Sequence, residues 1–264
     1  MPHRPGRPQT IMKRILVGLA ILGVVGWANL GLASDAVEKL SVKILKEYPH
    51  DTSSFTQGLV RSGQCVYEST GERGHSKLRE VRLADGKVIR ERKLPSQYFG
   101  EGLALAQGKL IQLTWTSGVA FVWDPETFEP AGQFSYQGEG WGLTFDGSWL
   151  IMSDGSNVLT FRDPATFAVW RHLPVTLEGR PVRNLNELEY VKGQVYANVW
   201  QSTQIVRIDP SSGRVTAVID ASSLPYKPRV PGSDVLNGIA YDPQKGTFLL
   251  TGKLWPRIFE VRIE

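Results

Sequence analysis

The chain has 264 residues, of which 41% are hydrophobic and 21% are charged, and its formal net charge is +4 at pH 7. The first 33 residues hold four basic residues and no acidic one, so the remainder carries equal numbers of both signs. Composition therefore gives no case for a nucleic-acid partner. Cys65 is the only cysteine, which excludes an intrachain disulfide.

The N-terminal segment has the pattern of a targeting sequence. An apolar run from 15 to 32 follows a basic pair, and the small residues Gly31 and Ala33 form an A-x-A-like cleavage site. The run also approaches the roughly 20 residues that span a bilayer. We therefore predict a signal peptide or an uncleaved signal anchor at 1–33. In either case, the domain at 34–264 is expected outside the cytoplasm, periplasmic or secreted, with membrane contact only through this segment if it stays uncleaved.

Behind this segment the sequence predicts β-strands alone. The stretch from Ala36 to Tyr48 alternates loosely between apolar and polar residues, as a half-buried strand does, and has no partner before it. Short strands separated by turns then follow in groups. They are expected at 57–60, 65–68, 78–83 and 88–94; at 103–105, 110–114, 119–123 and 130–134; at 143–145, 149–152, 158–161 and 168–173; at 188–191, 195–199, 205–208 and 214–219; and at 239–241, 248–251 and 258–263.

Each group opens on the same short pattern, in which a polar or aromatic residue is followed by a glycine in most copies and then by Leu or Ile. The pattern recurs every roughly 40 to 50 residues, which for strand-forming units is typical of a propeller. Glycine is expected here because the innermost strands crowd the axis. The copies are Gln57-Gly58-Leu59, Glu101-Gly102-Leu103, Trp141-Gly142-Leu143, Asn186-Glu187-Leu188 and Asn237-Gly238-Ile239.

A second feature keeps the same period. Asp-Pro turns stand between the third and fourth strands of three groups, at Asp124, Asp163 and Asp209. The fifth group is one strand short, and the spare strand near Val42–Tyr48 can complete it. We therefore predict an all-β fold, a five-bladed β-propeller with four-stranded blades, closed by the N-terminal strand in the last blade.

The residue that opens each pattern is predicted to face one mouth of the ring. The first and second strands of a blade are antiparallel, so the start of one lies beside the end of the other. Two sets of side chains should therefore share this rim. The inner set is Gln57, Glu101, Trp141, Asn186 and Asn237, and the outer set is Thr70, Trp115, Asp154, Trp200 and Lys253.

Each of these residues also has a purely structural interpretation. Glu101 could bond backbone amides, Asn186 and Asn237 could be turn residues, and Lys253 could be a solvated charge. The expected position of all of them on one rim favours a pocket. Three further tryptophans lie within predicted strands and are expected to pack inside the blades: Trp123, Trp149 and Trp170.

Other chemistries find little support in the sequence. The four histidines are scattered, with no cysteine or carboxylate at the spacing of zinc ligands. The sequence also lacks a G-x-S-x-G elbow, a phosphate-cradling glycine loop and a paired-cysteine motif.

The ordered set of motifs resembles the plant and bacterial type of glutaminyl-peptide cyclotransferase, or glutaminyl cyclase. The resemblance covers the chain from about Ser41 to its end. The motifs that carry it are Phe55-Thr56-Gln57-Gly58-Leu59, Glu68-Ser69-Thr70-Gly71, Phe99-Gly100-Glu101-Gly102-Leu103, Glu139-Gly140-Trp141-Gly142-Leu143, Asn186-Glu187-Leu188-Glu189-Tyr190, Asn198-Val199-Trp200 and Thr251-Gly252-Lys253-Leu254-Trp255-Pro256.

The resemblance implies a five-bladed propeller that converts the N-terminal glutamine of a peptide or protein to pyroglutamate and releases ammonia. It implies Glu101 as the acid/base residue, with Lys253 beside the substrate. We also expect Lys253 to be catalytic, because its charge can stabilise the oxygen that becomes negative in the reaction. The surrounding substrate-binding residues would be Gln57, Phe99, Trp115, Trp141, Asn186, Trp200 and Asn237. No cofactor is implied for catalysis. Members of this family have been seen with a metal in the central channel, but no side-chain motif here identifies such a site.

The chemistry of cyclisation agrees with these assignments. The α-amine of a peptide has a reference pKa of about 7.7 to 8.0, so it is mostly charged at neutral pH and must lose a proton before it attacks. Glu101, on the inner set, is the expected base, with Asp154 in reserve. Lys253 or an amide from Asn186 or Gln57 could stabilise the carbonyl oxygen in the transition state. The rival hypothesis is a non-catalytic propeller whose aromatic mouth binds a sugar or a cationic ligand.

Overall fold

The computed structural model describes residues 1–3, 6, 36–226 and 234–264. The chain divides into two units, Met1–Ser34 and Asp35–Glu264. Most of the first unit, including the predicted signal segment at 15–32, lies outside the described residues. No helix long and apolar enough to cross a membrane occurs in the described part of the chain.

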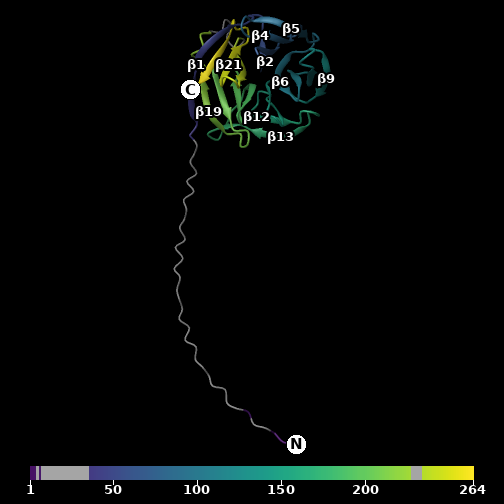
Figure 1. Cartoon of the computed structure of the whole chain (residues 1–264), viewed down its shortest axis with the longest axis vertical. Coiled ribbons are helices and arrows are strands. Elements are labelled where there is room, and N and C mark those ends of the chain that lie inside the picture. Colours follow the sequence, from purple (N-terminus) through teal and green to yellow (C-terminus); the bar gives the residue numbers. More distant parts are fainter. Residues whose placement is uncertain (4–5, 7–35, 227–233) are drawn as a thin grey trace. The chain divides into compact units, whose positions relative to one another are not determined.

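All regular elements of the described residues are β-strands, as the sequence predicts, and three groups form separate four-stranded antiparallel sheets (Figure 1). The first sheet contains β2 (Thr56–Ser62), β3 (Cys65–Thr70), β4 (Lys77–Arg82) and β5 (Lys87–Lys93). The second contains β6 (Gly100–Ala106), β7 (Lys109–Thr114), β8 (Val119–Trp123) and β9 (Pro130–Ser135). The third contains β10 (Leu143–Phe145), β11 (Leu150–Met152), β12 (Val158–Arg162) and β13 (Val169–Pro174), and a short hairpin, β14 (Thr176–Leu177) and β15 (Arg180–Pro181), follows it.

The last two groups join into one eight-stranded sheet through the N-terminal strand β1 (Glu38–Pro49). One half of this sheet is β16 (Leu185–Val191), β17 (Gln194–Val199), β18 (Gln204–Ile208) and β19 (Val215–Asp220). The other half is β20 (Leu236–Asp242), β21 (Thr247–Gly252) and β22 (Arg257–Ile263). The predicted pairing of the first strand with the last is confirmed, because β1 runs antiparallel to β22 from Val42 to Pro49. Its first residues also pair in parallel with β19, which the sequence did not predict.

The first strands of the five groups contact one another in a cycle, β2 to β6, β10, β16, β20 and back to β2. Glycine permits this close approach. A Cβ added to Gly102 would lie 2.5 Å from the backbone nitrogen of Leu143, and one added to Gly142 would lie 2.0 Å from the carbonyl oxygen of Asn186. The predicted crowding of the inner strands is therefore confirmed.

Five hydrophobic clusters lie between successive groups, and they follow the same cycle. The first two groups share the cluster that contains Leu78, Leu103 and Trp123. The other clusters join the second to the third group, the third to the fourth, the fourth to the fifth, and the fifth back to the first. Each group therefore buries both of its faces against its neighbours, and the first strands are held in register at the centre.

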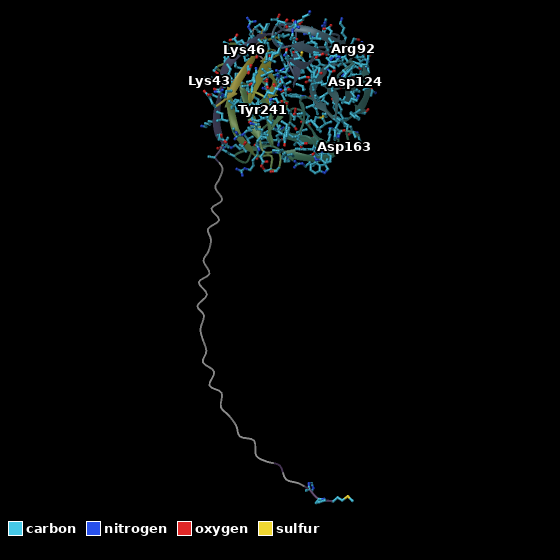
Figure 2. All side chains as sticks on the ribbon, in the orientation of Figure 1. Lys43, Lys46, Arg92, Asp124, Asp163 and Tyr241 are labelled. Carbon is cyan, nitrogen blue, oxygen red and sulfur yellow. The ribbon has the colours of Figure 1, made fainter. Side chains whose placement is uncertain are left out.

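The Asp-Pro turns occur where they were predicted. The side chains of Asp124 and Asp163 accept hydrogen bonds from the backbone N–H groups two and three residues later, and Figure 2 shows both at the edge of the unit. One tryptophan prediction is wrong. Trp170 is 54% exposed on the outermost strand of its sheet, where its ring stacks on Trp149 with 4.4 Å between ring centroids. The outermost strand of a sheet has solvent on one side. Trp170 therefore stacks on Trp149 at the surface and is not buried between two sheets.

Candidate active site

A cavity of about 200 Å³ lies where the first strands begin, and side chains from all five groups line it. Eight of its nine lining residues were predicted from the sequence or its family resemblance, and Phe55 is the addition. The lining consists of Phe55, Gln57, Phe99, Glu101, Trp115, Trp141, Asn186, Trp200 and Lys253. The predicted gathering of these side chains around one opening is present in the structure.

Backbone irregularities at the strand starts place the polar members of this set. The pairing of the first and second strands shifts register between Thr56 and Gly58, where Gln57 lies, and between Gly100 and Leu103, where Glu101 lies. The fourth and fifth groups have the same irregularity around Asn186 and around Asn237. Because a β-bulge redirects a side chain, these positions leave the regular alternation of the strand.

A chain of hydrogen bonds connects three of the predicted residues. The side-chain nitrogen of Asn237 donates to the Gln57 Oε1 at 2.9 Å and to the Thr56 carbonyl at 3.0 Å. The Gln57 Nε2 in turn donates to Glu101 Oε1 at 3.0 Å. Asn237 is not among the residues that line the cavity; it lies behind Gln57 and fixes the orientation of that amide. Its predicted contact with the substrate stays a prediction.

Two opposite charges are buried in this cavity. Glu101 is 5% exposed and Lys253 is 6% exposed. Burial raises the pKa of Glu101 well above its usual range, Lys253 opposes this rise, and the nearby Glu139 adds to it. Burial lowers the pKa of Lys253, and Glu101 opposes that shift. Each group is therefore closer to exchanging a proton near neutral pH than it would be in water.

Aromatic rings form the walls of the cavity. Phe55 and Phe99 meet edge to face at 6.0 Å between centroids, and Phe99 meets Trp115 in the same way at 5.7 Å. Trp141 and Trp200 form a second edge-to-face pair at 5.5 Å. The ammonium of Lys253 lies 4.8 Å from the centre of the Phe55 ring, within the range of a cation–π contact.

Glu139 connects two of these walls and was not predicted as a site residue. Its Oε2 accepts hydrogen bonds from the indole N–H of Trp115 at 2.6 Å and from that of Trp141 at 2.9 Å. Trp115 follows β7 and Trp141 precedes β10, so one carboxylate oxygen ties together indoles from two sheets.

Asn186 presents an unused acceptor. Its Oδ1 is buried and has no hydrogen-bond partner among the described residues, although Asn186 lines the cavity. Because a buried polar atom without a partner costs about 1–3 kcal/mol, this oxygen is suited to accept an N–H from a bound molecule.

Two residues of the predicted outer set lie elsewhere. Asp154 is exposed, is not part of the cavity, and accepts a hydrogen bond from the backbone N–H of Ser156. The hypothesis that it is a reserve acid is therefore wrong. Thr70 lines a different cavity with Arg79, and its hydroxyl accepts from the backbone N–H of Lys77.

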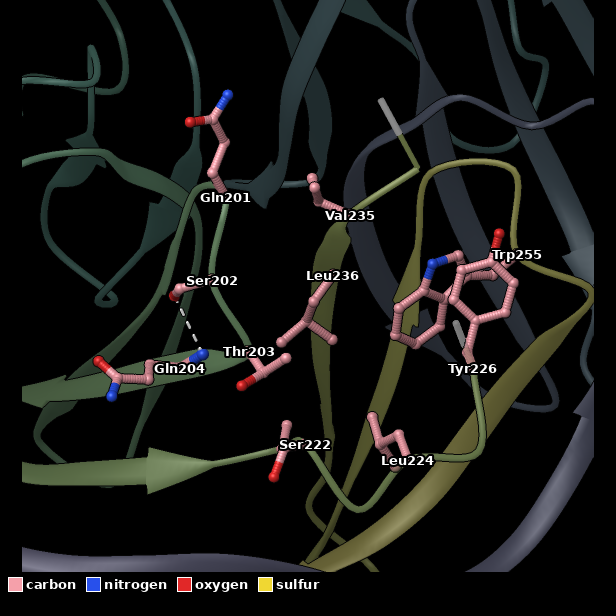
Figure 3. Close-up of a pocket in the computed structure, with 11 residues that line it drawn as sticks. Gln201, Ser202, Thr203, Gln204, Ser222, Leu224, Tyr226, Val235, Leu236 and Trp255 are labelled. Carbon is pink, nitrogen blue, oxygen red and sulfur yellow. Dashed lines mark hydrogen bonds between the residues drawn. The ribbon is translucent and has the colours of Figure 1, made fainter. Parts of the chain in front are cut away.

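A larger cavity of about 850 Å³ lies between β18, β19 and the strands of the fifth group (Figure 3). Within the described part of the chain its lining contains no ionisable carboxylate, imidazole or amine. The lining consists of Gln201, Ser202, Thr203, Gln204, Ala221, Ser222, Leu224, Tyr226, Val235, Leu236 and Trp255. The described part of this lining therefore offers no acid/base pair comparable to Glu101 and Lys253.

No group of three or more His, Cys, Asp or Glu side chains that could hold a metal occurs among the residues described. Glu187, which stands where the other groups have glycine, directs its carboxylate to the backbone N–H groups of Leu59 at 3.1 Å and Ile239 at 2.7 Å. Both of its oxygens are thus engaged by backbone N–H groups of the protein.

Comparisons with known proteins agree on one family. The model of the family described as Glutamine cyclotransferase matches residues 18–263. The chain is 39% identical over 260 residues to a protein of Arabidopsis thaliana named glutaminyl-peptide cyclotransferase, an alignment that covers 95% of this chain and 81% of the plant protein. It is also similar to the crystal structure of Myxococcus xanthus glutaminyl cyclase, with a TM-score of 0.80 and 41% identity over 86% of this chain and 98% of that one.

Proposed function

The chain belongs to the glutamine cyclotransferase family of enzymes, and on that premise we propose that its nine-residue cavity converts the N-terminal glutamine of peptides or proteins to pyroglutamate. The size of the cavity supports a small buried group. Drug-sized ligands occupy roughly 300–1,000 Å³, whereas this cavity measures about 200 Å³. It suits one terminal residue, with the rest of the peptide outside.

Glu101 is the proposed acid/base residue, and the observation that carries the proposal is its position. A carboxylate lies buried among aromatic rings with Gln57 donating to it, and burial raises its pKa well above the usual range of a glutamate. It accepts a proton from the α-ammonium of the substrate, and the free amine then attacks the side-chain amide carbon. After the new C–N bond has formed, a proton passes from Glu101 to the departing nitrogen, the old C–N bond breaks, and ammonia leaves. The carboxylate of Glu101 that this step regenerates takes up the surplus proton of the new ring nitrogen, which leaves the neutral lactam.

Lys253 and Asn186 have complementary proposed roles. As the amide carbon becomes tetrahedral, its oxygen gains negative charge, and the buried ammonium of Lys253 stabilises that charge in surroundings with little water. The unused Oδ1 of Asn186 accepts an N–H from the substrate. The indoles of Trp115, Trp141 and Trp200 hold the glutamine side chain folded back toward its own amine.

We propose further that the domain is a five-bladed β-propeller with the cavity at one end of its axis. The cyclic contacts of the five first strands and the cyclic order of the five hydrophobic clusters support this architecture. The β1–β22 pairing supplies the fourth strand of the last blade.

An extracytoplasmic location remains a proposal that rests on the sequence pattern of residues 1–33. Mass spectrometry of the N-terminus of the protein expressed in its own host tests it. A mature N-terminus near Ser34, or an intact chain in the membrane fraction, supports the proposal. An intact chain in the cytoplasmic fraction contradicts it.

The activity is tested with a peptide that begins with glutamine, by ammonia release and by the loss of about 17 Da, the mass of ammonia, from the peptide. We predict that Glu101→Gln keeps the fold and lowers kcat by about a hundredfold to ten-thousandfold, because positioned acid/base catalysis contributes that much. Asp154→Asn is the matched control and should keep the wild-type rate. Binding of the peptide without ammonia release would instead support a non-catalytic propeller, and near-normal turnover by Glu101→Gln would remove Glu101 from the mechanism.

A further inference from the structure

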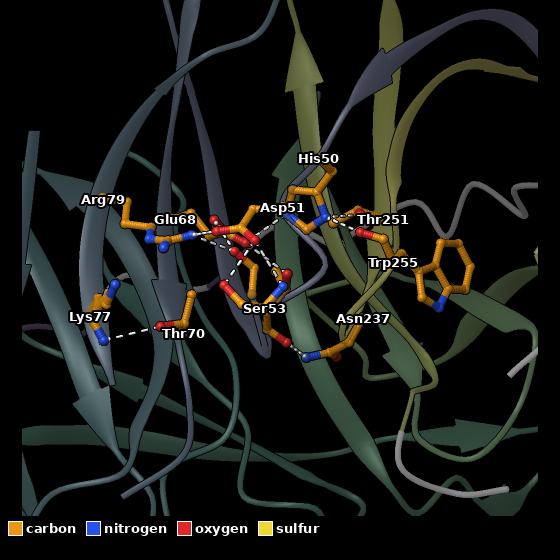
Figure 4. A network of polar contacts seen from close by, with 12 residues as sticks. His50, Asp51, Ser53, Glu68, Thr70, Lys77, Arg79, Asn237, Thr251 and Trp255 are labelled. Carbon is orange, nitrogen blue, oxygen red and sulfur yellow. Dashed lines mark hydrogen bonds and ion pairs between the residues drawn. The ribbon is translucent and has the colours of Figure 1, made fainter. Parts of the chain in front are cut away.

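The segment between β1 and β2 crosses the seam where the first and last groups meet (Figure 4). It contacts the turn between β21 and β22, the turn that carries Lys253. The backbone N–H of His50 donates to the Pro256 carbonyl at 3.0 Å, and the backbone N–H of Leu254 donates to the Ser54 carbonyl at 2.7 Å. The same segment leads directly to Phe55 and Gln57. It therefore connects the part of the cavity wall that carries these two residues with the turn that carries Lys253.

His50 lies between two hydrogen-bond acceptors. Its Nδ1 is 2.7 Å from the Trp255 carbonyl oxygen, and its Nε2 is 2.9 Å from Glu68 Oε1. A carbonyl oxygen only accepts hydrogen bonds, so Nδ1 must carry a proton. Thr251 Oγ1, 3.4 Å from Nδ1, donates its own proton to the Arg257 carbonyl and therefore also faces Nδ1 as an acceptor. An ionised Glu68 would require a proton on Nε2 as well.

The surroundings of Glu68 favour its ionised form. Its two oxygens accept hydrogen bonds from the hydroxyl of Thr56 at 2.8 Å and from that of Ser54 at 3.2 Å. The Arg79 guanidinium donates to the same Ser54 hydroxyl and to Asp51. Burial alone would raise the pKa of Glu68, but the charge of His50 and these hydrogen bonds outweigh it, so the pKa is lowered.

The charged groups around His50 favour its protonated form. Burial alone would lower the pKa of His50, but the Glu68 carboxylate outweighs this effect, and Asp51 adds to it, so the pKa is raised. Glu68 is 1% exposed and His50 is 9% exposed, so water cannot replace either partner. The seam thus contains a buried ion pair with one hydrogen bond on each side of the imidazole ring.

We infer that His50 carries a proton on both ring nitrogens and acts as a positioning residue, which fixes the Lys253 turn on one side and the Gln57 strand on the other. On one side the ring holds the carbonyl of Trp255, two residues after Lys253. On the other, Glu68 holds the hydroxyl of Thr56, which directly precedes Gln57. This inference rests on the proposed catalytic function, because it assigns His50 to the placement of Lys253 and Gln57.

The protonation state is tested on the unaltered protein by NMR of the histidine ring nitrogens. The chain has four histidines, so the His50 signals are assigned by comparison with a His50 variant. We expect both ring nitrogens of His50 to be protonated at pH 7.5, where an exposed histidine is mostly neutral. A ring with one bare nitrogen at that pH would overturn the inference, and this test needs no mutant activity.

The positioning role is tested with His50→Gln. The glutamine amide can still donate to Glu68 but cannot also reach the Trp255 carbonyl, so the Lys253 turn loses one support while Glu68 keeps a partner. We expect kcat to fall by about a hundredfold, with a much smaller change in KM, because displacements of about 1 Å have costs of this size when a group acts in the transition state.

Tyr48→Phe is the matched control. Tyr48 lies two residues earlier, and its hydroxyl donates to the buried Glu260 at 2.6 Å without touching the Lys253 turn. It should keep the wild-type kcat and KM. If His50→Gln folds and its kcat also stays within about threefold of wild type, a difference well under 1 kcal/mol, the positioning role is wrong. If the wild-type protein releases no ammonia from a glutamine peptide, the proposed function fails instead, and the NMR result still decides the charge of His50.

Discussion

At the scale of single residues, the site combines groups whose burial has opposite effects on their pKa values. Burial raises the pKa of Glu101 and lowers that of Lys253, while their mutual attraction opposes both shifts. Glu101 can therefore exchange a proton at a pH where an ordinary glutamate stays ionised, as its proposed acid/base role requires. Gln57 contributes by holding one oxygen of that carboxylate in place.

The raised pKa of Glu101 predicts the acid side of the pH profile. Only the carboxylate accepts a proton, so activity should fall as the pH drops through the pKa of Glu101. Because that pKa is raised, the fall should occur above the ordinary glutamate value of about 4.3. The measurement is kcat against pH for two glutamine peptides whose α-amines differ in pKa. The pH at which kcat falls on the acid side should be the same for both peptides. If that pH instead changes with the pKa of the substrate amine, the fall cannot be assigned to Glu101.

Glu139 gives a second prediction at this scale. Glu139→Ala removes the common acceptor of two indole N–H groups, so the walls formed by Trp115 and Trp141 should loosen and KM should rise about fivefold, as expected for the loss of about 1 kcal/mol. Glu139→Gln keeps an oxygen in the same place and should restore most of the affinity. If the two variants have equal KM values, the hydrogen bonds to the indoles do not position the walls.

At the scale of elements, the starts of the first strands determine both the site and the centre of the ring. In four of the groups, the pairing of the first strand with the second shifts register at this point. The fourth group has Glu187 in place of the glycine, and this carboxylate accepts backbone N–H groups from β2 and β20. Its side chain therefore connects three of the five first strands.

Glu187→Gly, which restores the residue found in the other groups, is predicted to destabilise the protein. The N–H groups of Leu59 and Ile239 would lose their acceptors, at a cost of about 1–3 kcal/mol for each group left unsatisfied. Urea unfolding followed by tryptophan fluorescence measures the change. An unchanged midpoint would show that water replaces the carboxylate as the acceptor of these N–H groups.

Most of the elements and much of the site could be predicted because the sequence repeats. The inner set could be located because the glycine of the repeated pattern marks the same position in four of the five groups. The outer set could be located less well, because its positions depend on a fixed distance from the preceding turn, and the second strands end at different distances from that turn. Trp115, Trp200 and Lys253 each stand directly after a strand, whereas Thr70 is the last residue of β3 and Asp154 lies two residues past β11. Since side chains alternate along a strand, a shift of one position directs them elsewhere.

The residues that the sequence analysis missed share a different position. Phe55 and Glu139 each lie two residues before the residue that opens the pattern, as the predicted Phe99 also does, and each contacts the cavity or its walls. This alternation could have identified Phe55 and Glu139. The role of His50 could not have been found in this way, because its partners lie 18 and 205 residues away and meet only when the first and last groups come together.

At the scale of the whole molecule, the domain depends on the contact between its first and last strands. β1 completes the sheet of the fifth group and also pairs with β19. Without it, β19 and β22 would both expose unpaired edges, and the cluster around Val42 and Phe259 would lose one of its faces. The cavity is sensitive to this closure, because Gln57 and Lys253 lie on opposite sides of the seam.

Substitutions in β1 test this dependence, with two positions of the same strand as a matched pair. Val42 is 6% exposed within a hydrophobic cluster, whereas Leu45 is 42% exposed. Val42→Asp should lower the free energy of unfolding by about 3–5 kcal/mol, because it buries a charge without a partner. Leu45→Asp should change it by no more than about 0.5 kcal/mol. Urea unfolding of both variants, with ammonia release measured in the absence of urea, should show loss of fold and activity together for Val42→Asp alone. Equal stability of the two variants would mean that β1 does not hold the ring closed.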